Sequence, residues 1–154
     1  MTRRDTCRGL PVPLIFFIVF FFAAGTVEAA SPAPVAVEIG VVVASNKGAS
    51  IDPSLSTLKT KLQSMFSYSS YSLLDRMRRT LAVGETGEFS LPGGRSMRVT
   101  PSAAPENKVR LAVQIMEGGK NLLTTTLGLS RGGMVLVGGP PHQSGVLILL
   151  ISAE

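Results

Sequence analysis

From Glu85 to the C-terminus, the chain is a series of short apolar or alternating segments separated by glycine turns. Residues 109–115 alternate strictly, so that Val109, Leu111, Val113 and Ile115 are expected to point to one side, as in a half-buried strand. Glycine-containing turns are expected around residues 92–94, 118–119 and 131–133, with a longer loop over 138–145. This spacing predicts consecutive antiparallel strands, because turns this short join neighbouring strands.

Two further segments have the composition of buried strands. Residues 35–44 are dense in β-branched side chains, and residues 146–151 are entirely apolar. A continuous apolar run of this length is typical of a strand that is covered on both faces. We therefore expect the first segment to be buried on both faces near its end, and the last to be central in the sheet or buried on both faces.

One segment, about residues 52–66, has the pattern of an amphipathic helix. Asp52 is suited to the N-cap, and Pro53 to the first helical position, where its missing N–H costs nothing. An apolar stripe follows at spacings of three and four, formed by Leu55, Leu58, Leu62 and Met65 or Phe66. The stripe is expected to pack on the sheet.

Residues 67–83 fit two alternatives. Tyr71, Leu73, Met77 and Leu81 alternate as in a strand, while Leu73, Leu74, Met77 and Leu81 also fit one helix face. The run of serine and tyrosine at 67–71 favours the strand. The predicted fold class is therefore α+β: a single domain over residues 35–154, mostly an antiparallel β-meander with one amphipathic helix on the sheet.

The first thirty residues have the pattern of a secretory signal peptide. Three arginines precede an unbroken apolar stretch, and small residues follow it. Cleavage is expected after Ala29 or Ala30, which makes residues 1–29 the signal and residues 30–34 a short leader rich in proline and alanine. The alternative is an uncleaved anchor over residues 10–26, although a spanning helix needs about 20 apolar residues.

Composition limits what the exported part can do. Cys7 is the only cysteine and lies in the signal, so the predicted domain has neither a disulfide nor a cysteine nucleophile. From residue 30 onward there are twelve Lys and Arg against eight Asp and Glu, a scattered excess that favours anionic surfaces only weakly. Nucleic acid is not an expected partner. Membrane contact is expected only through the signal segment or by weak electrostatic attraction.

The sequence contains no recognisable catalytic, cofactor-binding or metal-binding motif. Gly139–Gly145 has the look of a phosphate loop, but Val146 and Leu147 stand where lysine and Ser or Thr are required. His142, the only histidine, is expected to be a surface residue on a polar loop. We therefore expect a protein that is not an enzyme and has no cofactor.

The densest basic cluster is formed by Arg76, Arg78 and Arg79. On a strand, Arg76 and Arg78 would share one face with Leu74, where they could meet a phosphate-bearing lipid or an acidic partner. The alternative is a solvated strand face that discourages edge-to-edge pairing.

Residues 97–151, about a third of the chain, resemble the β-domain of outer-membrane secretins. The matching elements, in order, are Val99-Thr100-Pro101, Val109-Arg110-Leu111, Thr124-Thr125-Thr126, Gly132-Gly133, Val135-Leu136-Val137-Gly138-Gly139 and Leu147–Ile151. The chain lacks the tandem N-terminal modules and the length of a secretin, and its segment before the last strand is shorter. The resemblance implies a related β-fold in an accessory to an export machine, not a channel. The chain is also similar to small exported bacterial proteins in general.

The expected function follows from compartment and architecture. We expect a periplasmic or secreted module for protein interaction or envelope assembly, whose partner is another envelope protein. The first alternative is a binder of an anionic envelope ligand, a lipid headgroup or cell-wall polymer, through Arg76 and Arg78. The second is a periplasmic domain held at the inner membrane by residues 10–26.

Overall fold

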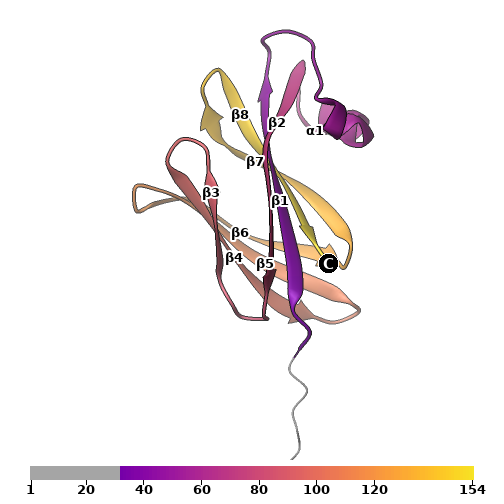
Figure 1. Ribbon diagram of the computed structural model, residues 1–154, viewed down its shortest axis with the longest axis vertical. Coiled ribbons are helices and arrows are strands. Elements are labelled where there is room, and N and C mark those ends of the chain that lie inside the picture. Colours follow the sequence, from indigo (N-terminus) through magenta and orange to yellow (C-terminus); the bar gives the residue numbers. More distant parts are fainter. Residues whose placement is uncertain (1–31) are drawn as a thin grey trace, which may run out of the picture. The chain divides into compact units, whose positions relative to one another are not determined.

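The structure, a computed structural model, describes residues 32–154 and contains eight strands and one short helical segment (Figure 1). The predicted signal peptide and its cleavage positions, Ala29 and Ala30, lie outside the described residues. The strands are β1 (Val35–Ser45), β2 (Ser70–Leu81), β3 (Gly87–Leu91), β4 (Arg95–Ala104), β5 (Lys108–Glu117), β6 (Lys120–Ser130), β7 (Gly133–His142) and β8 (Gly145–Ala153). The helical segment consists of a 3₁₀ turn, η1 (Pro53–Leu58), followed by α1 (Lys59–Met65).

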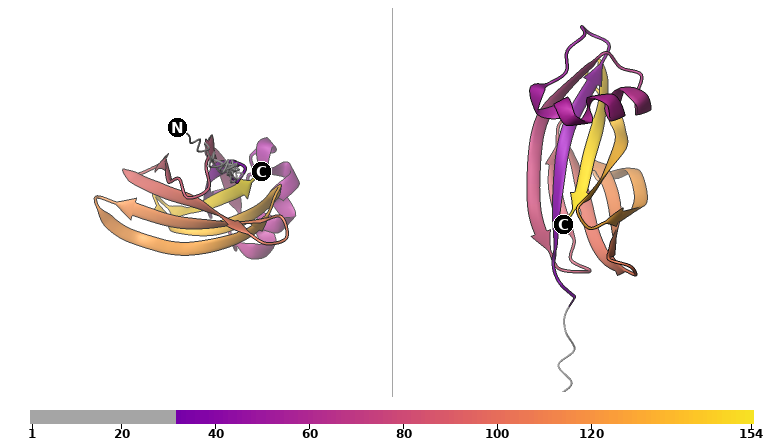
Figure 2. Two further views of the ribbon diagram at one scale, coloured as in Figure 1. Left: turned by 90° about the horizontal axis from the view of Figure 1, so that it is seen from below. Right: turned by 90° about the vertical axis from the view of Figure 1, so that its right-hand side faces the viewer.

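The strands form two four-stranded antiparallel sheets (Figures 1 and 2). The first has the order β2-β1-β8-β7, and the second the order β3-β4-β5-β6. Every pairing joins strands that follow each other in the chain, except that β8 returns to pair with β1. The chain crosses from one sheet to the other after β2 and after β6. β2 does not pair with β3, and β6 does not pair with β7, so the eight strands do not form one closed sheet.

The main core lies between the two sheets. Alternate side chains of β1, β4, β5 and β8 point inward and are buried, including Ile39, Met97, Val113 and Leu149. Val109, Leu111, Val113 and Ile115 all belong to this core, as their alternation predicts. The turn expected around residues 92–94 is also confirmed, because it joins β3 to β4 with Phe89 opposite Met97, both of them buried.

The helical segment covers part of the outer face of the first sheet and forms a second core there (Figure 2, right). Leu55 and Leu62 are buried against Val42, Ile148 and Leu150. Because β1 and β8 are therefore covered on both faces where they pass under the helix, their sequences are continuously apolar in that part.

The helical segment is held at both ends by polar contacts. Asp52 is the N-cap, and its carboxylate accepts hydrogen bonds from the Ser54 backbone N–H at 2.9 Å and the Ser54 hydroxyl at 2.6 Å. At the other end, the buried Tyr71 hydroxyl lies 2.6 Å from the carbonyl oxygen of Phe66 and 3.2 Å from that of Leu62. These contacts attach the end of the helix to β2. The Phe66 carbonyl lies beyond the last turn and takes its donor from Tyr71, whereas the Leu62 carbonyl also accepts the backbone N–H of Phe66.

The predicted fold class is confirmed, with three local differences. The meander is divided into two packed sheets, and the first turns of the helix are 3₁₀. Of the alternative positions in the stripe, Met65 is exposed, whereas Phe66 packs on the second core. The loop expected over residues 138–145 is wrong: β7 continues to His142, and an irregularity in the ladder between Gly138 and Pro141 accommodates the prolines. Residues 70–81 form a strand, as favoured over a helix.

Candidate functional site

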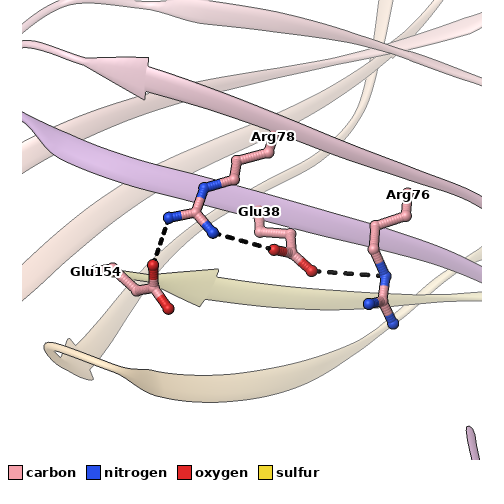
Figure 3. Close-up of polar contacts among 4 residues, drawn as sticks. All are labelled: Glu38, Arg76, Arg78 and Glu154. Carbon is pink, nitrogen blue, oxygen red and sulfur yellow. Dashed lines mark hydrogen bonds and ion pairs between the residues drawn. The ribbon is translucent and has the colours of Figure 1, made fainter.

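Arg76 and Arg78 lie on the same outer face of the first sheet (Figure 3). They lie outside the second core, which the helical segment covers. Glu38 on β1 is their neighbour: its carboxylate is 3.5 Å from Nε of Arg76 and 3.7 Å from Nη1 of Arg78. Arg78 also forms an ion pair with Glu154. The two arginines are thus matched by two carboxylates, which reduces their attraction for an external anion.

The rest of the basic cluster does not join this face. Arg79 points to the inner side of β2, where its guanidinium carbon lies 5.6 Å from the ring centre of Phe89. Leu74 falls at a bulge, because Val41 pairs with Asp75 and Val42 with Leu73. The common face predicted for Arg76 and Arg78 is confirmed, whereas Leu74 lies at the irregularity where the alternation shifts by one residue.

His142 belongs to a polar cluster that the sequence did not indicate. It is half-buried at the end of β7 and lies close to Gly93, in the turn between β3 and β4. A side chain at Gly93 would bring its Cβ to 3.6 Å from Nδ1 of His142. The same Cβ position is 3.2 Å from Nη1 of Arg95, whose Nε donates to Glu117 at 2.8 Å. Nη1 of Arg95 is buried and has no hydrogen-bond partner among residues 32–154. The sequence offered one signal for the burial of Arg95: it alternates with Met97 and therefore points to the inner face of β4.

The four sheet edges differ in how well they are protected against pairing with another strand. β2 carries exposed Asp75, Arg76, Arg78 and Arg79, and it contains a bulge. β3 has only five residues, and β7 contains Pro140 and Pro141 near its end. Charges, bulges, prolines and short length are the features by which natural edges resist edge-to-edge pairing.

β6 has neither a charge nor a proline between Asn121 and Ser130. Its one bulge, at Leu122, lies near its start and leaves Leu123 to Ser130 in regular register with β5. Along its length it pairs with β5 on one side only, within the part of the chain that the structure describes. Its inward side chains Leu123 and Leu127 are only partly buried, and Leu122 is 38% exposed. β6 is therefore a long, uncharged edge with apolar side chains still accessible.

A small hollow lies between the β6 edge and β7, where the two sheets separate. Its volume is about 170 Å³, and it is lined by Leu122, Leu123, Gly138, Gly139 and Pro140. The lining is mostly apolar, and the glycines provide no side chain to fill it. We call this hollow, together with the β6 edge, the β6 seam.

Residues 32–154 contain no group of three or more His, Cys, Asp or Glu side chains placed to hold a metal ion. Within the same residues, no helix is long and apolar enough to cross a bilayer.

Comparison with known proteins yields no match to a family model, a curated protein or a solved structure.

Proposed function

We propose that this chain is an exported, non-enzymatic interaction module that binds an extended segment of another envelope protein along the open edge of β6. The observation that carries the proposal is the contrast between edges: β6 offers ten consecutive residues without charge or proline, while β2, β3 and β7 are each protected. Strand addition to an exposed sheet edge is a common mode of peptide recognition, in which backbone hydrogen bonds supply affinity.

The geometry of β6 specifies the segment that would fit. The inward row Leu123, Thr125, Leu127 and Leu129 borders the core, while the outward row Thr124, Thr126, Gly128 and Ser130 is solvated. A partner strand would therefore place apolar side chains at every second position, over the β6 seam, and polar side chains between them. Its apolar row would cover Leu123 and Leu127, which are only partly buried.

The export part of the proposal rests on the N-terminal sequence pattern. Edman sequencing or intact mass of the protein from the envelope of its own cells should give a chain that begins at residue 30 or 31. A chain that retains residue 1 in the membrane fraction would support the anchored alternative, and one that retains it in the cytoplasm would contradict export.

The binding part is tested with peptides selected by phage display against the protein as its cells process it. Amide hydrogen exchange should then show slowed exchange along residues 121–130 when a selected peptide is added. The selected sequences should alternate apolar and polar residues. Protection confined to another edge, or peptides without alternation, would overturn the proposal.

Charge substitutions provide the matched control. T124K with T126K places two lysines on solvated positions of β6, so folding should be retained while strand addition is opposed. Binding of the selected peptide should fall at least tenfold. S72K with T80K places the same number of lysines on exposed positions of the protected β2 edge and should leave binding unchanged. Equal loss in both variants would show a general charge effect and contradict recognition at β6.

A further inference from the structure

The outer face of the second sheet contains a polar hollow that is separate from the β6 seam. Its volume is about 310 Å³, and it is lined by Thr86, Arg98, Thr100, Ala112 and Gln114. The register explains its position, because Thr100 pairs with Ala112, and Arg98 with Gln114, on the adjacent strands β4 and β5. The small side chain of Ala112 leaves the floor open between larger neighbours.

The side chains around this hollow are mainly hydrogen-bond donors. Arg98 supplies a guanidinium and Gln114 an amide, while no carboxylate is among the lining residues. The hydroxyl oxygens of Thr86 and Thr100 lie 2.7 Å apart. Because one hydroxyl donates to the other, the accepting threonine keeps its own O–H hydrogen free to donate outward. These donors can together bind a chemical group that carries negative charge and several acceptor oxygens.

Arg98 retains donors for such a group. Its Nε lies 3.5 Å from Oε2 of Glu88, and both side chains are about half exposed. An exposed pair at this distance contributes little, so Glu88 competes weakly. The terminal guanidinium nitrogens can form a bidentate pair with a carboxylate or phosphate, which is the strongest arrangement available to arginine.

We infer that this hollow binds an oxyanion group, a carboxylate or a phosphate, with Arg98 as its charged partner and Gln114 and the threonine pair as neutral donors. The site is distinct from Arg76 and Arg78, whose guanidinium groups are matched by Glu38 and Glu154 on the other sheet. It is also independent of peptide binding at β6, since it is lined by other strands.

The test is an NMR titration of the processed protein with inorganic phosphate and, separately, with glucuronate at constant ionic strength. The side-chain signals of Arg98 Nε–H and Gln114 NH₂ should shift with a saturable curve. The anion that binds more tightly identifies the source of the oxyanion group, a phosphate or a sugar acid. If neither anion shifts these signals, the inference is overturned.

Three variants separate a specific site from general attraction. R98Q removes the charged donor, and A112L fills the floor without changing charge; each should weaken binding about tenfold or more. R110Q removes an exposed positive charge that lies on the same face but outside the hollow, and it should bind as the unchanged protein does. If R110Q loses as much affinity for the anion as R98Q does, the anion is held by net charge alone and the inference is wrong. Normal binding by A112L would also overturn it, because the anion would then not occupy the hollow. Amide spectra away from the hollow report whether each variant is folded.

Discussion

Asp52 shows how one side chain sets the start of the helical segment and gives it a pH dependence. The pKa of Asp52 lies below its ordinary value because the Ser54 hydroxyl and then the Ser54 backbone N–H donate to the carboxylate. A lowered pKa in the folded state means that the stabilisation is complete above the unfolded-state value of about 3.9 and is lost as the pH falls through the folded-state value.

The D52A variant should therefore be less stable than the unchanged protein at pH 7, and the difference should shrink at acid pH. Urea denaturation at several pH values between about 2 and 7 measures this difference. D52N is the control, because its amide oxygen can still accept the cap hydrogen bonds without titrating. A D52A deficit that stays constant over the whole range would contradict the assigned role.

Arg95 is the other residue whose environment makes a clear prediction. Its side chain is largely buried, yet Nη1 has no acceptor among the described residues, while Glu117 is 45% exposed and can be hydrated without it. R95M keeps the packing of the alkyl chain and removes an unsatisfied donor. We expect its free energy of unfolding to change by less than about 1 kcal/mol, because replacing a buried charge with an apolar side chain is often neutral. A loss above about 3 kcal/mol in chemical denaturation would show that the guanidinium has an essential partner.

At the scale of elements, the contact between β2 and the helical segment depends on Tyr71. Its hydroxyl is within hydrogen-bond distance of the carbonyl oxygens of Phe66 and Leu62, and the side chain is fully buried. Y71F should lower the free energy of unfolding by about 1–3 kcal/mol, because the Phe66 carbonyl loses its hydroxyl donor while the ring still fills its space. Hydrogen exchange should increase mainly in residues 59–66. Y68F, at a half-buried tyrosine, is the control and should have a smaller effect.

For the whole molecule, the two sheets share one core, so they should unfold together. Ile39 is fully buried in that core, opposite Met77 on β2 and Ile151 on β8. I39A should lower the free energy of unfolding by about 2–5 kcal/mol, the usual range for such a truncation. Circular dichroism and hydrogen exchange in β5, on the other sheet, should follow the same transition. Separate transitions for the two sheets would contradict a common core.

How far the sequence predicts the fold depends on whether a pattern is local. Alternation in residues 109–115 and the Asp52-Pro53 pair identified a strand and a helix start, because each depends on neighbours a few residues away. The bulge at Leu74 and the end of β7 at His142 depend on how strands pair across the sheet, which the residues themselves do not specify. These positions were missed or misplaced for that reason.

The candidate sites also depend on strand pairing rather than on local patterns. The sequence by itself determined that residues 35–154 form antiparallel strands with one packed helix, since side-chain periodicity and turn residues act over short distances. Only the tertiary structure decided that Glu38 and Glu154 would stand beside Arg76 and Arg78, that β6 would be left as an unprotected edge, and that Ala112 would open a hollow beside Arg98. Each of these depends on which strands become neighbours, and that is set by packing two sheets around one core rather than by any segment alone.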